Sequence, residues 1–497
     1  MISKLRYAIS TGLILLSVST FSVFAQEPGA EGIGDSLYPT LGNGGYDVLH
    51  YYVDLDIDMQ RQSVVGITTI EATSTQALSS FNLDFSNRGL TVTSVLVDRT
   101  PASFDHLRNE LIITPTSPLD AEADFVVVVE YRGQPRAERH PLLGDNGWIS
   151  ERNYLFVAGE PVSALTWFPV NEHPLDKATY TFEITVPEDY IAVANGILTD
   201  TVTEAGSTTF IYDMAYPMAS YLTTLGVDRF AIQTETLDNG IVIRNVFPES
   251  YAETGERMFG AQAEMITVFS ELFGPYPFEI YGALVVQSSL GFALETQTLS
   301  IFGLDVLYGP AGSSDTVIAH ELAHQWFGNS VSVDDWSNIW LNEGFATYAS
   351  WLWFEASVGP EELDTLVRDS YAFMSGSAFL DEGYSEQEAR DIIESSFVPP
   401  GAPPPEELFN IAVYERGALT LHALRLEIGD DAFFELIRTY YAQYANSNAS
   451  ISDFIELAQD ISGMNLERFF DTWLYDVYMP AIPSMGLTNP FKGGQLN

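Results

Sequence analysis

The sequence predicts a multidomain protein of mixed α and β class, in which an N-terminal antiparallel β-sandwich domain is followed by a mainly helical domain. Three observations support this prediction. The chain has 497 residues and 46% of them are hydrophobic, which suffices for two or three domains of roughly 100–200 residues each. From about Tyr46 to Val227 apolar and polar residues alternate with a period of two, as in half-buried strands. From about Asp228 the period changes to 3.6, which is typical of amphipathic helices.

The first half contains strand patterns separated by turns rich in Gly, Pro, Asn and Asp. Residues 53–59 alternate apolar side chains with aspartates, and residues 180–186 alternate in a similar way. Each of these segments predicts a strand with one buried face. Residues 125–129 read Phe-Val-Val-Val-Val, which predicts a more fully buried strand. We therefore expect an antiparallel β domain at residues 46–227.

The aspartates at positions 54, 56 and 58 stand at alternate positions, as do the oxygen ligands that open an EF-hand calcium loop. The sixth position of that loop must turn sharply and is normally Gly, whereas this chain has Met59. The aspartates therefore indicate the solvated face of a strand rather than a calcium site.

The second half contains segments with helical periodicity, within a domain that we expect at residues 228–487. These segments are residues 254–272, 315–327, 342–356, 361–374, 415–428, 431–444 and 453–461. A short β segment is expected at residues 280–286. The proline-rich residues 398–405 predict a loop, because consecutive prolines cannot continue a helix.

The first 25 residues differ in composition from the rest of the chain. Lys4 and Arg6 precede a short apolar run that ends in Val-Phe-Ala at residues 23–25, which is the arrangement of a secretory signal peptide. An uncleaved membrane anchor is the alternative, but the run is short for a membrane span and contains several Ser and Thr residues. We expect export to a periplasm or to the cell exterior, with no stable membrane insertion after signal removal. Residues 26–45 are then an N-terminal linker, and residues 488–497 a C-terminal tail.

Acidic residues strongly outnumber basic ones. The chain has 68 Asp and Glu against 21 Lys and Arg, and its formal net charge is −47. This balance argues against binding to nucleic acid, because phosphate affinity depends on Lys and Arg. It is suited to salty surroundings, where ions screen the repulsion among carboxylates. Since the chain contains no cysteine, disulfide bonds do not stabilise it.

His320-Glu321-Leu322-Ala323-His324 is an H-E-x-x-H motif inside a helical segment. Two histidines four residues apart project from one face of a helix, one turn from each other. Both imidazoles can therefore bind one zinc ion, and Glu321 can reach a water molecule beside it. The alternative is a pair of ordinary helix histidines. It is improbable, since a shuffled chain would contain the motif on the order of once in a hundred.

A catalytic zinc ion usually has a third protein ligand and leaves its fourth position to water. The candidate is Glu343, in the segment Trp-Leu-Asn-Glu-Gly-Phe-Ala at residues 340–346, with eighteen residues between His324 and it. A lone helical glutamate is usually solvated. The apolar and aromatic neighbours of Glu343 argue otherwise, because a buried carboxylate needs a cation or a proton.

Residues 320–329, the eighteen-residue gap and residues 340–346 together resemble the aminopeptidase N family of gluzincin zinc metallopeptidases, which includes leukotriene hydrolase. Three further marks extend the resemblance over most of the chain. They are Tyr414-Glu415-Arg416-Gly417, similar to the family's Tyr-x-Lys/Arg-Gly; Glu160-Pro161 with Trp167-Phe168-Pro169, Pro174 and Lys177; and Gly-Phe-Ala-Leu-Glu-Thr at residues 291–296, where the family usually has Gly-Ala-Met-Glu-Asn.

The resemblance implies a thermolysin-like zincin catalytic domain with one Zn²⁺ ion per chain. It implies that His320, His324 and Glu343 bind the metal and that Glu321 is the general base. It also implies that Tyr414 donates a hydrogen bond to the tetrahedral intermediate.

The family's amine-binding carboxylates match Glu160 and Glu295. Two carboxylates at the closed end of a cleft favour an α-ammonium group there, so the peptide bond that reaches the metal is the first one. We therefore expect a secreted zinc aminopeptidase that acts on peptides with a free N-terminus. The sequence does not predict the preferred side chain or the oligomeric state.

Three alternatives remain open at this point. A zinc endopeptidase would share the metal site but would not need Glu160 and Glu295. An epoxide hydrolase like leukotriene hydrolase would use the same constellation. A catalytically silent binding protein would keep the fold, although such proteins usually have a broken ligand set.

Overall fold

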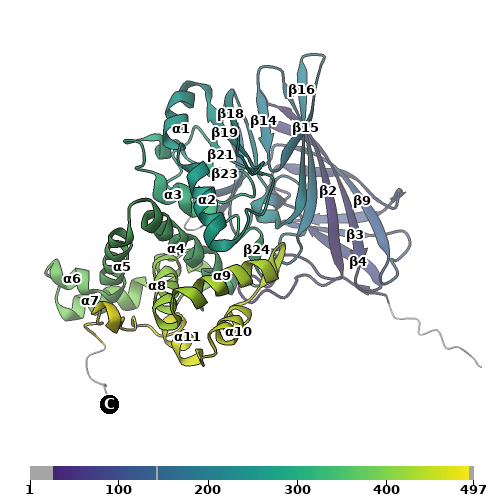
Figure 1. Ribbon diagram of the computed structural model, residues 1–497. Helices are drawn as coiled ribbons and strands as arrows, with labels where there is room; N and C mark the ends of the chain where they lie inside the picture. Colours follow the sequence, from purple (N-terminus) through teal and green to yellow (C-terminus); the bar gives the residue numbers. More distant parts are fainter. Residues whose placement is uncertain (1–25, 141–143, 492–497) are drawn as a thin grey trace, which may run out of the picture.

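The computed structural model describes residues 26–140 and 144–491. The predicted signal peptide, residues 1–25, lies outside these residues, and so does most of the predicted tail. Strands fill the first half of the described chain and helices most of the second, as Figure 1 shows from purple to yellow. The boundary expected at residue 227 falls within β17 (Leu225–Asp228) and stays a prediction.

The first half is organised around a large, mostly antiparallel sheet. In spatial order its strands are β15 (Ile197–Glu204), β16 (Ser207–Met218), β13 (Ala178–Pro187), β2 (Tyr46–Asp58), β3 (Ser63–Ser74), β9 (Asp124–Gly133), β5 (Leu90–Val97) and β6 (Thr100–Pro101). Side chains of β2 alternate between buried and exposed, so Asp54 and Asp56 lie on the solvent face. Asp58 accepts hydrogen bonds from the amides of Gln60 and Arg61. The three aspartates therefore belong to a strand and its turn, as expected.

The prediction for residues 125–129 is wrong in one respect. They lie in β9, but Val126 is 36% exposed while Phe125 and Val127 are buried. Because β9 pairs antiparallel with β3 and β5 in a sheet that has one solvent face, the outward valines stay accessible to water.

Two smaller sheets accompany the large one. The first contains β1 (Glu27–Pro28), β4 (Leu78–Asp84), β8 (Glu110–Thr114) and β7 (Ser103–Leu107). The second contains β10 (Glu138–His140), β11 (Gly144–Ser150), β12 (Leu155–Ala158), β17 and β14 (Ile191–Ala194). The ring of Phe81 on β4 packs edge-on against Phe125 on β9 and Tyr46 on β2. This contact between sheets is the packing of a β-sandwich.

A further sheet opens the second half. Its strands are β18 (Phe230–Thr236), β19 (Val242–Pro248), β21 (Ala283–Val285), β23 (Ser300–Phe302) and β22 (Ala293–Leu294), and β20 (Ile280–Tyr281) pairs with β19. β22 is at the edge of this sheet and leads directly into Glu295. Two short strands, β24 (Val331–Val333) and β25 (Ser447–Ala449), pair parallel beside the helices.

α1 and α2 lie in the chain between β19 and β20, and the helices from α3 onward follow the sheet and form a cluster beside it (Figure 1). The helices are α1 (Ala252–Met258), α2 (Gln262–Phe273), α3 (Asp315–Ala323), α4 (Trp340–Ser357), α5 (Pro360–Ser375), α6 (Ser377–Asp381), α7 (Glu386–Ser396), α8 (Ile411–Ile428), α9 (Asp430–Tyr444), α10 (Ile451–Ser462) and α11 (Glu467–Leu474). Short 3₁₀ helices are η1 (Ala164–Thr166), η2 (Ser220–Leu222), η3 (Glu249–Tyr251), η4 (Leu304–Leu307), η5 (Trp336–Asn338), η6 (Pro405–Glu407) and η7 (Pro483–Met485). Among the described residues, no helix is both long and apolar enough to cross a bilayer.

Some helix predictions need correction. The segment 254–272 is two helices, α1 and α2, because the chain turns at residues 259–261. The helix expected at 315–327 ends at Ala323 and continues as a turn. The helix expected from Glu415 begins four residues earlier, at Ile411. The prediction missed α6, α7 and α11.

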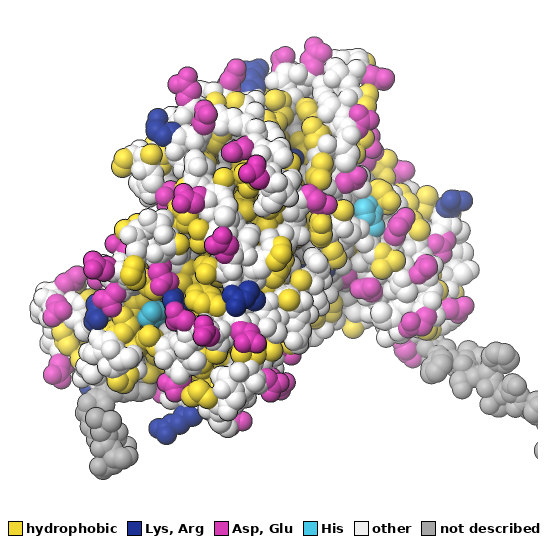
Figure 2. Space-filling model, viewed as in Figure 1, with side chains coloured by type: hydrophobic (Ala, Val, Ile, Leu, Met, Phe, Trp, Pro, Cys, Tyr) yellow, Lys and Arg dark blue, Asp and Glu magenta, His cyan; other side chains and the backbone are white. Residues whose placement is uncertain are grey.

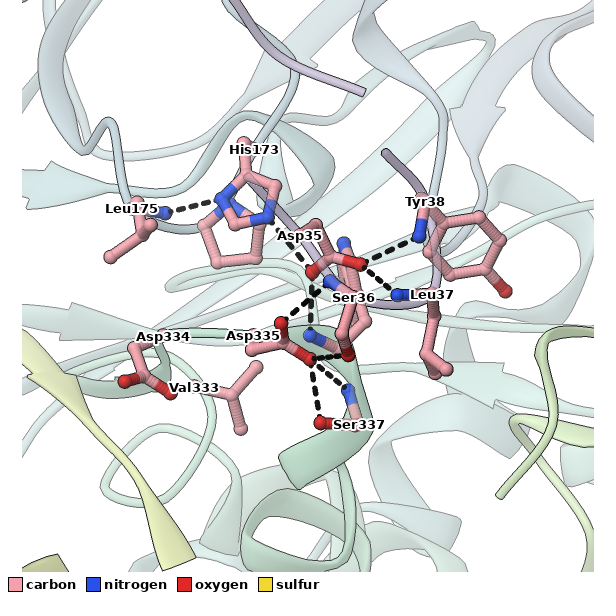
Figure 3. A network of polar contacts seen from close by, with 12 residues as sticks. Asp35, Ser36, Leu37, Tyr38, His173, Leu175, Val333, Asp334, Asp335 and Ser337 are labelled. Atoms are coloured by element: carbon pink, nitrogen blue, oxygen red, sulfur yellow. Dashed lines mark hydrogen bonds and ion pairs between the residues drawn. The ribbon is translucent and has the colours of Figure 1, made fainter. Parts of the chain in front are cut away.

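The N-terminal arm, residues 26–45, packs between the two halves. The Asp35 side chain is fully buried and accepts hydrogen bonds from His173 Nε2 at 3.1 Å and from the Trp336 amide at 2.8 Å (Figure 3). It also accepts from the amides of Leu37 and Tyr38. One carboxylate thereby joins the arm, the β half and the start of η5, which runs into α4.

A second carboxylate strengthens this junction from the helical half. Asp335 accepts hydrogen bonds from the amide and the hydroxyl of Ser36, each at 2.7 Å, and also caps η5 through Ser337 (Figure 3). The Tyr38 hydroxyl donates to the Pro405 carbonyl at 2.9 Å, in the loop that leads to α8. The arm therefore holds the segments that precede α4 and α8.

Lys177 ties the two halves together at another point. Its Nζ donates to the carbonyls of Asn329, Ser330 and Ser447 at 2.9–3.0 Å. The first two carbonyls belong to the turn that follows α3, and the third belongs to β25. A single half-buried ammonium thus positions the turn behind the H-E-x-x-H motif.

Candidate metal centre and active site

The two motif histidines lie at the end of α3. Their Nε2 atoms are 3.1 Å apart, as the one-turn spacing of a helix predicts. His324 Nδ1 lies 3.0 Å from the Phe327 carbonyl, so Nδ1 carries a proton and Nε2 is the nitrogen that can bind a metal. His320 Nδ1 lies 3.4 Å from the Thr347 hydroxyl. Both rings therefore direct Nε2 towards the same point.

Glu343 reaches this point from the first turn of α4. Its Oε2 lies 3.2 Å from His320 Nε2 and 3.4 Å from His324 Nε2. The side chain is 4% exposed. α4 packs across α3, and the close packing of these two helices brings Glu343, which is separated from His324 by eighteen residues, back to the histidines.

These three atoms fit a tetrahedral zinc ion. Zinc bonds of about 2.0–2.1 Å at tetrahedral angles place neighbouring ligand atoms roughly 3.3–3.4 Å apart. The three separations here are 3.1, 3.2 and 3.4 Å. The donor set of two neutral imidazoles and one carboxylate is also one that zinc accepts.

The electrostatics of the site favour a cation. Burial works against a charged imidazole, but Glu295 and Glu343 raise the pKa of His324 to about 10. Burial likewise works against an ionised Glu343, but His324 and His320 lower its pKa to about 2. The surrounding carboxylates therefore stabilise positive charge at the point where the three ligand atoms converge.

Glu160 and Glu295 lie beside this point. Carboxylate oxygens of Glu160, Glu295 and Glu343 are all within 4.8 Å of one another. Glu160 and Glu295 are each 2% exposed, and each has one oxygen without a hydrogen-bond partner among the described residues. Burial and the negative charge of Glu295 raise the pKa of Glu160. An unpaired, buried anionic pair of this kind can bind a cationic group.

Glu321 and Tyr414 complete the surroundings. Glu321 is 5% exposed, and its Oε2 has no partner among the described residues. One of its oxygens lies within 4.8 Å of ligand atoms of Glu295 and His324. The Tyr414 ring, in the first turn of α8, stacks on the His320 ring at 5.9 Å. All of the residues predicted for the site therefore lie together.

They line a cavity of about 590 Å³. β22 and the residues just before it form one wall. β23, η4, α3, α4 and the start of α8 contribute most of the other lining residues. The cavity is thus large enough for the first residues of a peptide.

Comparison with known proteins identifies the family. Residues 257–473 match the Peptidase family M1 domain, and residues 48–222 match the Peptidase M1 N-terminal domain. The chain belongs to the M1 peptidase family. The resemblance to aminopeptidase N drawn from the sequence is thereby confirmed.

M1 relatives with curated names include aminopeptidase M1 of Arabidopsis thaliana, 26% identical over 67% of this chain and 38% of the relative. Human glutamyl aminopeptidase is 27% identical over 78% of this chain and 41% of the relative. The chain thus spans less than half the length of these relatives.

The M1 fold is shared with solved structures. An M1 zinc metallopeptidase mutant from Deinococcus radiodurans, bound to a Tyr-Ser-Ala substrate, matches with a TM-score of 0.79 and 29% identity. The match covers 91% of this chain and 99% of that one. The predicted fold class, a β-rich N-terminal domain before a helical catalytic domain, is confirmed.

Three supporting residues of this M1 site were not singled out in the sequence. Gln325 Nε2 and Asn329 Nδ2 donate to the Glu295 carbonyl at 3.1 and 2.7 Å and so hold the end of β22 against α3. Thr347 contacts His320, as described above. The signals were present: Gln325 and Asn329 are polar residues in an apolar turn, and Thr347 stands four residues after Glu343 on the same helix face.

The remaining described histidines of this M1 chain lie elsewhere. His173 bonds to Asp35, and His422 Nδ1 lies 3.2 Å from the Tyr348 hydroxyl. His50 contacts two threonine hydroxyls, and His106 contacts the Phe85 carbonyl. Each of these four has a structural partner, and none of the four lines the cavity.

Proposed function

We propose that this protein is a secreted zinc-dependent aminopeptidase that hydrolyses the N-terminal peptide bond of peptides. The observation that carries the proposal is the position of two buried carboxylates, Glu160 and Glu295, beside the three convergent atoms of His320, His324 and Glu343. Family membership and the solved relative with a bound Tyr-Ser-Ala substrate support it.

His320, His324 and Glu343 are the residues that would hold the metal. Zinc, when bound, polarises a scissile carbonyl and lowers the pKa of water to about 7. The hydrogen bonds of His324 to Phe327 and of His320 to Thr347 fix the orientation of the two rings.

Glu321 is suited to the general base role. Glu321 lines the cavity, and one of its carboxylate oxygens lies within 4.8 Å of ligand atoms of Glu295 and His324. Burial raises the pKa of Glu321 well above its usual range, which increases its basicity. Glu321 takes a proton from the attacking water and delivers it to the leaving amine, and such a role contributes typically 10²–10⁴-fold to the rate.

Tyr414 is suited to stabilise the oxyanion that develops at the attacked carbonyl. Its ring is held against His320, and burial keeps its pKa well above 10. The hydroxyl therefore stays protonated and donates. A donor placed in advance stabilises the transition state more than the substrate, because charge develops only there.

Glu160 and Glu295 account for removal of a single residue. They bind the free α-ammonium group of the substrate by charge-assisted hydrogen bonds. Because they lie within a few ångströms of the metal ligands, the first peptide bond is the one that reaches the reacting groups. An endopeptidase would not need this pair.

Export completes the proposal. The basic and apolar composition of residues 1–25 and the Val-Phe-Ala that ends it support a cleaved signal peptide. N-terminal sequencing of the mature protein in the producing cell is expected to begin at Gln26. A mature chain that retains Lys4 and Arg6 would indicate a membrane anchor instead.

The deciding experiment combines metal analysis with a substrate panel. Purified protein is assayed on aminoacyl anilides and short peptides, with and without a chelator. The same substrates are also tested with acetylated N-termini. We expect chelator-sensitive hydrolysis of the free substrates only. Cleavage of acetylated peptides would favour an endopeptidase. Turnover of a lipid epoxide, without turnover of the aminoacyl substrates, would favour an epoxide hydrolase. The absence of any turnover would favour a binding protein.

A further inference from the structure

The charged side chains that line the cavity are mainly acidic. Six carboxylates line it, and no lysine or arginine is among the described residues that do so. The carboxylates are those of Glu160, Glu295, Asp305, Glu321, Glu343 and Glu415. The other ionisable groups on the wall are the two histidines and Tyr414.

The arginines of the nearest helix are directed elsewhere. Arg416 follows Glu415 on α8, yet it is 2% exposed and donates to the carbonyls of Thr472, Trp473 and Val477 at 2.7–3.2 Å. Arg425, further along α8, pairs with Glu355 and Asp430. Neither guanidinium is free to turn towards the cavity.

The carboxylates near the proposed metal site carry more negative charge than the proposed bound cations supply. Glu160, Glu295, Glu321 and Glu343 carry four formal negative charges. A divalent ion and one ammonium group supply three positive charges. Asp305 and Glu415 also lie on the wall, and no lysine or arginine lines it among the described residues, so an additional anion entering the cavity is repelled.

The rest of the wall is largely apolar. Its large apolar side chains are Phe292, Leu294, Phe302, Val306, Val317, Trp351, Phe409 and Ile411. They come from β22 and the residues before it, β23, η4, α3, α4 and the start of α8 with the residues before it. A carboxylate entering such a wall loses water and gains no cationic partner, whereas an aliphatic or aromatic side chain gains contacts.

We propose that the cavity selects against an acidic first residue and accepts apolar, amide and basic ones. This inference rests on the proposed aminopeptidase function and specifies its substrate class. It separates this chain from an enzyme specialised for N-terminal glutamate or aspartate, although relatives of that name are among its matches.

The test compares two first residues of nearly the same size that differ in charge. The kcat/KM on a glutaminyl anilide is expected to exceed that on the glutamyl anilide on the order of 10- to 100-fold near neutral pH, as repulsion at a few ångströms implies. Leucyl and arginyl anilides are expected to be hydrolysed at least as well as the glutaminyl one. Rates on the glutamyl and glutaminyl substrates within twofold of each other would overturn the proposal.

A variant that introduces a positive charge tests the electrostatic origin of the selection. Ile411 lines the cavity at the start of α8 and is 43% exposed, so a polar side chain fits there without burial. Ile411→Arg is expected to reduce the glutaminyl-to-glutamyl ratio at least threefold. Ile411→Gln controls for shape, and Glu204→Gln, on an exposed strand away from the cavity, controls for net charge. An unchanged ratio in Ile411→Arg would also contradict the proposal.

The outcomes separate this inference from the proposed function. If no aminoacyl anilide is hydrolysed, or hydrolysis is insensitive to a chelator, the aminopeptidase itself is refuted. If the glutaminyl substrate is hydrolysed in a chelator-sensitive way and the glutamyl substrate equally well, only the charge selection is refuted.

Discussion

Gly344 on α4 and Gly417 on α8 lie backbone against backbone. A Cβ atom at Gly344 would stand 2.9 Å from the Gly417 Cα, and a Cβ at Gly417 would stand 2.8 Å from the Gly344 Cα. Gly344 follows Glu343, the proposed third metal ligand, and Gly417 stands one turn after Tyr414. The approach of the two helices therefore sets the distance between these functional side chains.

Gly417→Ala is expected to force α8 away from α4. Overpacking of this kind costs about 1–3 kcal/mol of stability, and displacement of Tyr414 by a fraction of an ångström to 1 Å is expected to lower kcat by up to ~10². Urea unfolding and steady-state kinetics measure the two effects. Gly260→Ala is the matched control, because a Cβ there meets nothing closer than 3.6 Å. Equal behaviour of the two variants would show that the helix contact is unimportant.

Glu321 and Glu343 are both buried glutamates of the site, and we expect isosteric variants to separate their roles. Glu321→Gln should retain about one zinc per chain while its kcat falls by about 10²–10⁴. Glu343→Gln should lose both zinc and activity, because it removes a charged ligand. Elemental analysis after dialysis distinguishes the two. Zinc loss in Glu321→Gln, or full zinc retention in Glu343→Gln, would reverse the assignment.

Tyr414→Phe removes only the hydroxyl and keeps the ring that stacks on His320. We expect kcat to fall on the order of 10²–10³, as on loss of one oxyanion donor, while KM and zinc content change little. The variant should also unfold at the same urea concentration as the wild type. A fall confined to KM would mean that Tyr414 binds the substrate rather than the transition state.

Asp35→Asn should weaken the junction of the N-terminal arm in a pH-dependent way. His173 Nδ1 accepts from the Leu175 amide, so Nε2 carries the proton and donates to Asp35. Burial opposes ionisation of Asp35, but the hydrogen bonds from His173, Trp336, Tyr38 and Leu37 lower its pKa below its usual range. In Asp35→Asn, the side-chain NH₂ group would replace one accepting oxygen, and this donor would then face another donor.

A depressed carboxyl pKa contributes stability that is fully present above the unfolded value of about 3.9 and is lost as the pH falls through the folded value. The difference in unfolding free energy between wild type and Asp35→Asn is therefore expected to be about 1–3 kcal/mol at pH 7 and to shrink below pH 4. Asp120→Asn, at an exposed position, is the control. A difference that does not vary with pH would contradict the ionised Asp35.

The acidic surface makes stability depend on salt. Figure 2 shows Asp and Glu spread over the visible face with few Lys or Arg among them, in keeping with the net charge of −47. Sodium chloride should raise the thermal unfolding midpoint, because it screens repulsion among carboxylates. Sucrose of equal osmolality controls for solute exclusion. A midpoint that stays constant or falls with salt would refute this account.

Much of the site was predictable because its signals are local. The spacing of His320 and His324 follows from the 3.6-residue turn, so a helix is enough to bring the two rings together. Alternation in β2 and β13 likewise gave the buried faces. α7 was missed although Ser385 and Glu388 form a capping box, because the helix is too polar for its periodicity to stand out.

The pairing of strands and the packing of helices cannot be predicted from local sequence signals. Nothing local marks Val126 as exposed, since that depends on which face of β9 the sandwich covers. The arm at residues 26–45 looks like a linker, yet Asp35 is buried through contacts with residues more than a hundred positions away.

Residue identity and helical spacing are enough to point to the two histidines, the candidate third ligand and the family. The approach of Glu343, Glu160 and Glu295 to within a few ångströms, and a cavity wall without lysine or arginine among the described residues, depend on the folded arrangement. Distant segments converge through packing contacts such as Gly344 against Gly417, and no single segment contains that information.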